Sequence, residues 1–374
     1  MLTLLLLALG LVIYTYAGYP LLCALRARLR PRPLRPRGEG QVPVSVIIAA
    51  FRERASIEAK LASLGAQHYP PELLEVIVCC DGSDDGTQEV ARRAGERYLP
   101  GRLRVLDLPR RGKPSALAAG VAAARGEVLV LTDARQPLST GAIAALCRDL
   151  TDPEVGVVSG ELVLEGDEGA GTYWRYEAWI RRNEARAGSV VGVSGALYAL
   201  PRRLWRPPPP ETILDDLWVP MQVRLEHGLR VVLEPEARAW DRAAPDAREF
   251  SRKARTLAGN FQLLWLMPAL LSPLRNPSFF DFVSHKLCRL LVPYALLLML
   301  LISVALCLSE DPPALITYLC AAQLLAYGAA LLSLAGLGRG LRLVRLAGTF
   351  VVLNAAAVVG LVRLLRHGRH QPWT

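Results

Sequence analysis

The chain has 374 residues, of which 52% are hydrophobic, and its mean hydropathy is +0.26. This is too apolar for a purely soluble protein of this length, so a soluble domain joined to membrane segments is predicted. The net charge is +10, but no aromatic residues interleave with the basic ones, and nucleic acid is therefore not an expected partner.

The first 25 residues carry no charged side chain and are followed by a cluster of six arginines between Arg26 and Arg37. At 1.5 Å per residue this stretch exceeds the ~30 Å hydrocarbon core. A signal peptide would place its basic residues before the apolar stretch, so residues 1–25 are predicted to be a retained transmembrane anchor whose C-terminal side is cytosolic. Residues 26–42 are expected to form a basic Pro/Arg-rich tether.

From residue 43 to 260, strand-like and helix-like segments alternate. Strands are predicted at 44–49, 73–80, 103–108 and 128–132, and helices at 56–64, 87–94, 114–124 and 140–150. In the helix at 56–64, Ile57, Leu61 and Leu64 recur at helical spacing. This alternation predicts an α/β fold with a mixed, mostly parallel sheet flanked by helices. The chain has no G-x-G-x-x-G after its first strand and no P-loop, which argues against a dinucleotide oxidoreductase and a P-loop NTPase.

The second half of this domain is more mixed, with strand-like stretches at 192–198 and 231–234 and a basic helix at 248–259. Residues 261–285 are expected to be an amphipathic interfacial segment. Apolar runs at 290–309, 312–338 and 346–362 predict about three transmembrane helices within 286–366, followed by a tail at 367–374. Four spans would place the basic tail opposite the cytosol, against the positive-inside tendency, so the topology stays open.

The seven cysteines are odd in number, include no C-x-x-C and fall partly in membrane runs. We therefore expect reduced thiols and no disulfide framework. The five histidines are scattered, and a structural zinc site is not predicted.

Two apolar strands end in a carboxylate, at Asp81-Gly82-Ser83 and at Asp133-Ala134-Arg135. In open α/β sheets nucleotides bind at the carboxyl ends of strands, so these two acids predict a nucleotide site. The competing interpretation is a pair of turns or helix caps, because Asp, Gly and Ser are turn-forming residues.

These motifs, in this order, resemble the family-2 glycosyltransferases, which are membrane-bound inverting enzymes with a GT-A fold. The likeness covers residues 44–260. Val44–Glu53 resembles the first strand and its nucleotide-contacting turn, with Arg52 where the family usually has Asn. Asp81-Gly82-Ser83 matches the first acidic motif, and Gly112-Lys113 matches a Gly-Lys before a helix. Asp133-Ala134-Arg135 occupies the D-x-D position, but with Arg in place of the second acid.

The resemblance extends to two later motifs. Asp215-Asp216 falls where the family places its general base, and Arg252–Thr256 falls where processive members carry Q-x-x-R-W, although Gln and Trp are missing here. The resemblance implies that Asp216 is the base and Asp215 its neighbour in catalysis, and that Asp133 binds a divalent cation, Mg²⁺ or Mn²⁺. It also implies a set of donor-binding residues: Ala50, Glu53, Asp81, Ser83, Lys113, Asp133, Arg135, Arg252 and Arg255.

Structural roles compete with several of these assignments. Asp215 and Asp216 suit the cap of a following helix, Arg252 and Arg255 suit a basic helix against anionic lipid, and Lys113 suits a solvated surface. Arg135 also suits direct contact with a diphosphate.

The resemblance implies an inverting glycosyltransferase that moves a sugar from a nucleoside-diphosphate donor to a lipid-linked saccharide or polysaccharide. It would be an integral membrane protein, expected in a bacterial inner membrane, with a cytosolic catalytic domain in contact with membrane lipids. A processive polysaccharide synthase is the alternative within this class. A transporter or scaffold with a non-catalytic nucleotide-binding domain and a nucleotidyltransferase are the alternatives outside it. The sequence leaves open the sugar, the base, the acceptor and the oligomeric state.

Overall fold

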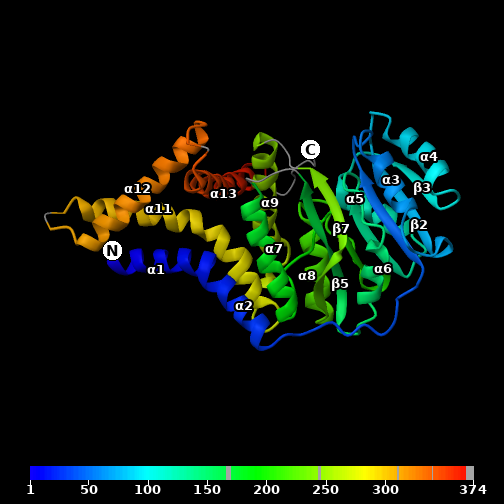
Figure 1. Ribbon diagram of the computed structural model, residues 1–374, viewed down its shortest axis with the longest axis horizontal. Helices are drawn as coiled ribbons and strands as arrows, with labels where there is room; N and C mark the ends of the chain where they lie inside the picture. The colour runs from blue at the N-terminus through cyan, green and yellow to red at the C-terminus, as the bar shows by residue number, and fades with distance from the viewer. Residues whose placement is uncertain (166–169, 243–245, 310, 339, 368–374) are drawn as a thin grey trace. The chain divides into compact units, whose positions relative to one another are not determined.

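The computed structural model describes residues 1–165, 170–242, 246–309, 311–338 and 340–367 (Figure 1). The chain divides into two compact units. The sheet unit comprises the described residues of 23–243 and 266–279, and the helical unit comprises those of 1–22, 244–265 and 280–369. Each unit is described by itself below.

The sheet unit is built on one seven-stranded sheet with the strand order β3-β2-β1-β4-β6-β5-β7. The strands are β1 (Val44–Ala50), β2 (Leu74–Asp81), β3 (Leu103–Leu108), β4 (Val128–Asp133), β5 (Val155–Glu165), β6 (Leu197–Pro201) and β7 (Arg230–Arg242). Strand β1 pairs in parallel with β2 and β4, β2 with β3, and β5 with β7, whereas β6 runs antiparallel to both β4 and β5. The predicted mixed, mostly parallel sheet is therefore confirmed.

Helices cover both faces of this sheet (Figure 1). They are α3 (Ile57–Gly65), α4 (Thr87–Tyr98), α5 (Lys113–Ala123), α6 (Ala142–Asp149), α7 (Ala170–Ala187) and α8 (Asp215–His227), with short 3-10 turns at Pro71–Leu73, Arg202–Leu204 and Pro268–Leu271. Helices α3, α4 and α6 share one apolar core with Val46 and Ile48 of β1. Helix α5 packs on the opposite face, where a Cβ at Gly120 would lie 2.6 Å from atoms of Ile47 and Cys79. This strict alternation along β1 assigns neighbouring residues to opposite faces.

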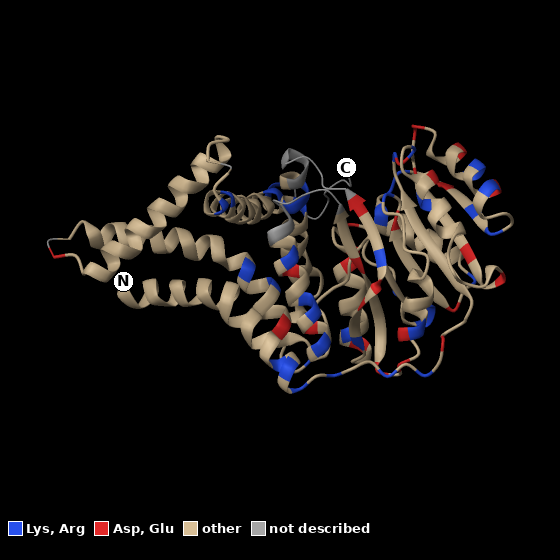
Figure 2. Cartoon of the chain, viewed as in Figure 1, with Lys and Arg blue, Asp and Glu red and all other residues tan. Residues whose placement is uncertain are grey.

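The helical unit holds long apolar helices. Its elements are α1 (Leu2–Ile13), most of α9 (Asp246–Leu266), α10 (Phe279–Phe282), α11 (Cys288–Cys307), α12 (Ala314–Leu334) and α13 (Arg342–His367), and α2 (Tyr19–Leu29) continues from it into the sheet unit. Four helical stretches among the described residues are long and apolar enough to cross a membrane: Leu2–Leu29, Phe279–Cys307, Ala314–Leu334 and Arg342–Arg366. Helices α1 and α12 carry no Lys, Arg, Asp or Glu (Figure 2).

Two of these long helices contain a π-helical turn, at Tyr14–Gly18 and at Val283–Leu287. The turns face each other, because the Tyr14 and Ser284 hydroxyls lie 2.7 Å apart in a hydrogen bond. Beyond them, Leu5 and Ala8 of α1 share a small apolar core with residues of α11 such as Met299 and Ile302. The two π turns therefore lie at the same end of the packed pair of helices, directly after α1 and directly before α11.

The element boundaries differ from the expected interfacial segment at 261–285. Helix α9 runs through residue 260 without a break and ends at Leu266, because Pro268 lacks an amide hydrogen and restricts Met267 before it. The following span begins at Phe279, ahead of the expected boundary at 286. Residues 368–374 of the expected tail lie outside the described residues.

Candidate functional site

An ion-paired cluster forms at the first residue of α5. The Lys113 Nζ donates a hydrogen bond to Asp133 Oδ1 at 2.9 Å and lies 3.3 Å from Asp215 Oδ1. Asp133 is the last residue of β4 and Asp215 is the first residue of α8, so three elements bring these side chains together. The Lys113 and Asp215 side chains are only 13% and 6% exposed, whereas that of Asp133 is 30% exposed.

The charge balance of this cluster fixes Lys113 in its protonated form. Burial opposes the charge, but Asp133, Asp215 and Asp216 outweigh it and hold the pKa of Lys113 well above its ordinary value. The second carboxylate oxygen of Asp215 is buried and has no hydrogen-bond partner among the described residues. The cluster thus contains a buried acceptor in addition to its ion pairs.

Asp81 lies at the end of β2 and organises the loop before α5. Its carboxylate is 1% exposed and accepts hydrogen bonds from the amides of Arg111 at 2.7 Å and Gly112 at 2.9 Å, with Arg110 Nη1 at 3.7 Å. Gly82 follows with φ +66°, and a Cβ there would lie 2.9 Å from the Arg110 backbone nitrogen. Asp81 is therefore connected to the Lys113 cluster through the two residues that precede Lys113.

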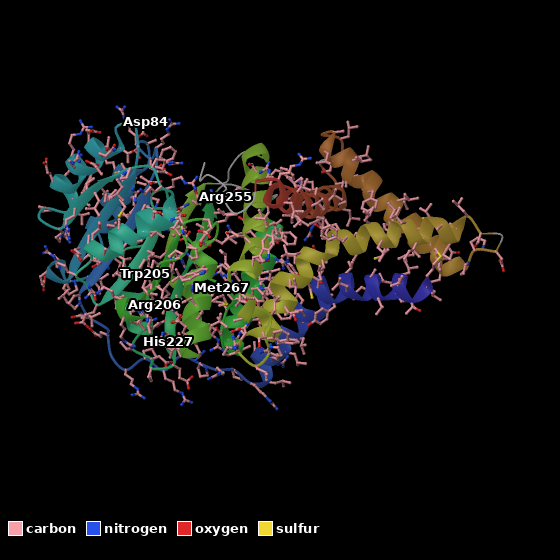
Figure 3. The ribbon with its side chains drawn as sticks, turned by 180° about the vertical axis from the view of Figure 1, so that it is seen from behind. Asp84, Trp205, Arg206, His227, Arg255 and Met267 are labelled. Atoms are coloured by element: carbon pink, nitrogen blue, oxygen red, sulfur yellow. The ribbon has the colours of Figure 1, made fainter. Side chains whose placement is uncertain are left out.

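The turn after β1 packs against the loop after β2. The Arg52 amide donates to Ser83 Oγ at 3.1 Å, and the Ser83 hydroxyl donates to the Ala50 carbonyl at 3.4 Å. The Arg52 guanidinium makes two hydrogen bonds of 2.7 Å with the exposed Asp84, which is labelled in Figure 3. Arg52 has φ +54°, a conformation that these contacts support.

Glu53 and Arg135 extend the site toward the same turn. Glu53 Oε1 lies 3.6 Å from Arg135 Nε, so the arginine that replaces the second acid of D-x-D faces a carboxylate. Burial raises the pKa of Glu53, and Arg135 partly opposes this effect. The predicted donor-binding residues Glu53 and Arg135 are thus paired with each other.

Asp216 follows Asp215 but faces a different segment. Its carbonyl accepts a hydrogen bond from the Val193 amide at 3.0 Å, and a Cβ at Gly195 would lie 3.1 Å from its Oδ2. Gly195 is the glycine that gives this carboxylate room. Close by, the buried Tyr198 hydroxyl makes no hydrogen bond with the described residues, and burial raises its pKa, with Asp215 and Asp216 adding to the shift.

Two residues that sequence reasoning missed are Tyr198 and Lys60. The Lys60 side chain is completely buried, and its Nζ donates to Thr132 Oγ1 and to the Gln136 carbonyl, both at 2.6 Å. Burial lowers its pKa to about 7, while the charge of Asp133 opposes the shift. The signal for Lys60 is its position three residues after Ile57 and four before Leu64, on the apolar face of α3.

The predicted residues therefore fall into two sets. The members of the first set are linked through adjacent residues or direct contacts; they are Asp81, Lys113, Asp133, Asp215 and Asp216. The turn with Ala50, Glu53 and Ser83 joins this set through Arg135 and through the loop after β2. Arg252 and Arg255 lie on α9 in the helical unit, three positions apart (Figure 3 labels Arg255).

The side chains available as metal ligands limit how a divalent cation could be held. No group of three His, Cys, Asp or Glu side chains suited to a metal ion occurs in the described part of the chain. Asp133 is partly exposed and uses Oδ1 for Lys113, which leaves its other carboxylate oxygen for an ion. Mg²⁺ commonly takes one or two protein carboxylates and completes its shell with substrate phosphates and water, and the site fits this arrangement.

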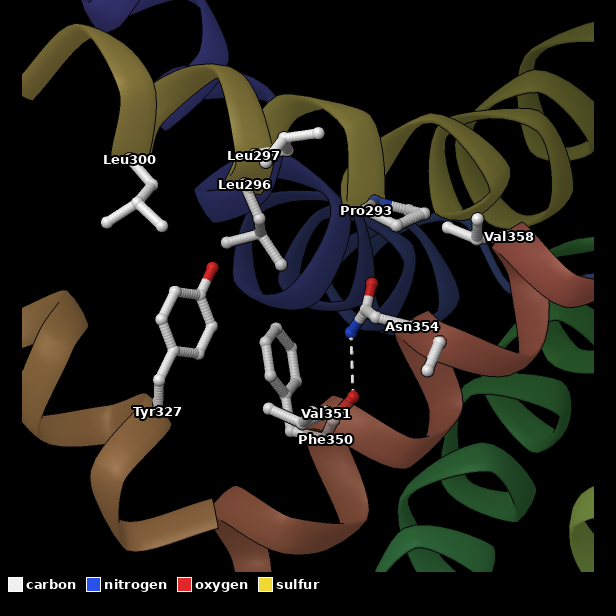
Figure 4. A pocket seen from close by; sticks show the side chains of 10 residues that line it. Pro293, Leu296, Leu297, Leu300, Tyr327, Phe350, Val351, Asn354 and Val358 are labelled. Carbon is white, nitrogen blue, oxygen red and sulfur yellow. Dashed lines mark hydrogen bonds between the residues drawn. The ribbon is translucent and has the colours of Figure 1, made fainter. Parts of the chain in front are cut away.

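A separate cavity of about 230 Å³ lies in the helical unit, between α11, α12 and α13 (Figure 4). Its lining is almost entirely apolar, with Tyr327 and Asn354 as the polar side chains, and Asn354 donates to the Phe350 carbonyl at 2.8 Å. It contains no acid or base comparable to the cluster in the sheet unit.

Comparison with known proteins points in one direction. Residues 45–202 match the family model described as glycosyl transferase family 2. An N-acetylglucosaminyltransferase of Rhizobium meliloti (strain 1021) is 34% identical over 148 residues, which is 38% of this chain and 34% of that protein. A probable glycosyltransferase of Bacillus subtilis (strain 168) is 32% identical over 121 residues, which is 32% of this chain and 29% of that protein. The matches span about a third of the length of these relatives.

One solved structure is similar over almost the whole chain. It is a mannosyltransferase from Pyrobaculum calidifontis in complex with GDP-Man and Mn²⁺. The identity is 25% and the TM-score 0.76, with 98% of this chain and 99% of that chain covered.

Proposed function

Residues 45–202 are a glycosyl transferase family 2 domain, and on this premise we propose that the protein is an inverting glycosyltransferase. It takes a sugar from a nucleoside-diphosphate donor and adds it to a membrane-associated acceptor, a lipid-linked saccharide or a polysaccharide. The observation that carries the proposal is the convergence of Lys113, Asp133 and Asp215 beside the loop that Asp81 holds.

Sugar transfer needs a neutralised diphosphate leaving group, an activated acceptor hydroxyl and alignment of the two. In this proposal Asp81, Ser83, Ala50 and Glu53 bind the nucleoside side of the donor. The cations next to them, Lys113 and Arg135, face the diphosphate, as the N-terminus of α5 does.

Asp133 would hold a divalent cation, Mg²⁺ or Mn²⁺, together with the donor phosphates. When bound, the ion supplies positive charge to the leaving group. The Mn²⁺ of the similar mannosyltransferase structure supports this assignment. Lys113 orients the Asp133 carboxylate for that role, because its Nζ fixes Oδ1 and leaves the other oxygen for the ion.

Asp216 is proposed as the general base. Asp215 is fixed against Lys113, whereas Asp216 is partly exposed and borders the glycine at 195. Asp216 then takes the acceptor proton as the hydroxyl attacks the anomeric carbon, and the nucleoside diphosphate leaves from the opposite side, which inverts the configuration.

The four apolar helical stretches support an integral membrane protein, and the basic residues 26–42 support a cytosolic catalytic domain. We propose that the domain works at an inner bacterial membrane on a lipid-anchored acceptor. Arg252 and Arg255 would contact phosphate there, of the donor or of a lipid.

A donor screen tests the function. Purified full-length protein is incubated with UDP-, GDP- and dTDP-sugars, with Mg²⁺, Mn²⁺ or EDTA, and the released nucleotide is identified. We expect one base to be preferred, a nucleoside diphosphate to be released and EDTA to abolish turnover. Release of pyrophosphate would instead indicate a nucleotidyltransferase, and absence of both turnover and nucleotide binding would contradict the proposal.

The base assignment is tested with Asp216→Asn. We expect turnover to fall at least about 100-fold while donor affinity is retained, because a positioned base contributes roughly 10²–10⁴ in rate. Asp107→Asn, an exposed acid on β3 paired with Arg92, is the matched control and should keep full activity. Long polymer from a single binding event would favour the processive synthase.

A further inference from the structure

Lys60 occupies an unusual place for a lysine. It lies on α3, is 0% exposed, and its two hydrogen-bond partners are the neutral oxygens of Thr132 and Gln136. Thr132 faces the α3 side of the sheet, whereas its neighbour Asp133 faces Lys113 on the α5 side. Lys60 therefore contacts β4, the strand that carries Asp133, on the face of the sheet opposite to the Asp133 side chain.

This arrangement costs stability. Lys60 makes no ion pair with any residue that the structure describes, and burying an ammonium group without a carboxylate is unfavourable. Replacing a buried ionic group by a well-packed apolar one of similar volume is often neutral or stabilising. A core role alone would therefore be better filled by methionine at this position.

The contacts of Lys60 reach both acid-bearing segments. The Gln136 carbonyl lies at the end of the turn that presents Asp133 and Arg135. Thr132 Oγ1, which accepts from Lys60, donates in turn to the Ala196 carbonyl at 2.5 Å. Ala196 follows Gly195, the residue that borders the Asp216 carboxylate.

We propose that Lys60 is a positioning residue that fixes the Asp133 turn and the Gly195–Ala196 segment relative to each other. The inference rests on the proposed glycosyl transfer, because it assigns Lys60 to the geometry of that site. Lys60 contacts neither substrate nor cation. It acts through Gln136 on the residues that hold the diphosphate, and through Thr132 and Ala196 on the surroundings of Asp216.

The test is Lys60→Met in the full-length protein, with thermal stability, nucleoside-diphosphate affinity and steady-state kinetics measured side by side. Partners that orient a site typically affect activity 10–100-fold, so we expect kcat/KM to fall at least about tenfold. The melting temperature should equal or exceed that of the wild type, and the affinity for nucleoside diphosphate with Mn²⁺ should weaken. Thr132→Val breaks the hydrogen bonds of Oγ1 to Lys60 and to Ala196 but keeps the bond from Lys60 to the Gln136 carbonyl, so it should lower kcat with a smaller change in donor KM.

Gln67→Met is the matched control. Gln67 is buried just after α3, and its side chain forms hydrogen bonds with the backbone of Ser63, Ser139 and Ile143. It therefore also joins the α3 region to the segment after β4, but without a hydrogen bond to Thr132 or Gln136. We expect it to lower the melting temperature and leave kcat/KM unchanged. Wild-type kinetics of Lys60→Met would overturn the inference. A loss of activity in Lys60→Met that only parallels its loss of stability would also overturn it. In that case, wild-type kinetics of Thr132→Val would confirm that the contacts of Lys60 do not position the site. If the wild type itself transfers no sugar, the proposed function fails first.

Discussion

Lys113 offers the sharpest test of the site's electrostatics, because one ammonium group serves two carboxylates. Lys113→Met removes the charge and keeps an unbranched side chain of similar length. Asp133 is 30% exposed and can recruit water, but Asp215 is 6% exposed and loses its only ion-pair partner among the described residues. The cost should therefore come mainly from Asp215.

The magnitude follows from the burial of this pair. Removing one partner of a buried ion pair costs about 3–5 kcal/mol, and the 13% exposure of Lys113 places this pair near the lower end, at about 3 kcal/mol. A domain of this size loses roughly 2–4 °C in melting temperature per kcal/mol, so we expect Lys113→Met to melt about 6–12 °C below the wild type.

The assay is thermal unfolding of the full-length protein in detergent, with the double variant Lys113→Met/Asp215→Asn alongside. A neutral amide at 215 needs no counter-charge, so the double variant should regain at least half of the lost stability, which is a non-additive pair. If Lys113→Met melts within 2 °C of the wild type, or the second substitution lowers stability further, the reasoning is refuted.

Three further outcomes can be measured on the same protein. Burial raises the pKa of Asp149 to about 7, and Glu234 adds to the shift. The folded state therefore binds more protons than the unfolded chain between about pH 4 and 7, and stability falls as pH rises through that window. In thermal melts from about pH 5 to 7.5, Asp149→Asn should flatten this decline, and an unchanged slope would contradict the prediction. Gly82→Ala forces a side chain into φ +66° against the Arg110 backbone and should cost about 1–3 kcal/mol by chemical denaturation, together with weaker nucleotide binding. Tyr198→Phe removes a buried hydroxyl that has no partner among the described residues, so the melting temperature should stay equal or rise, and a drop of several degrees would show that the hydroxyl is bonded.

The first half of the sheet was predictable because its strands are unbroken apolar runs that stop at a polar residue. Strands β2 and β4 end at Asp81 and Asp133, and β1 lies between them in parallel register. The long strands β5 and β7 were largely hidden. Their pairing slips between Gly160 and Glu161, where the partner residue moves from Glu234 to Arg238, and such an irregularity breaks the period of two that sequence reading relies on.

The site was predictable in its acids and not in its connections. Strand ends and motif order selected Asp81, Asp133, Asp215 and Asp216, but spacing along the chain does not reveal that Lys113 joins two of them. Lys60 was missed although the helical spacing of Ile57, Leu61 and Leu64 places it on a buried face. Lysine side chains are mostly exposed in proteins, so the residue type predicts solvent exposure where the helical spacing of the apolar neighbours predicts burial.

The paired π turns at Tyr14–Gly18 and Val283–Leu287 also determine what changes of chain length the helical unit can absorb. A π turn holds one residue more than the plain α-helix it interrupts. The wide turn absorbs this residue locally, so deleting a single amino acid within it would restore regular winding and leave the rotation of the rest of the helix nearly unchanged. The same deletion in regular helix between Ala8 and the first π turn would rotate α1 by about 100° and move Leu5 and Ala8 away from Met299 and Ile302. Frame-preserving losses of one codon should therefore be tolerated better within the two π turns than in the regular helix beside them.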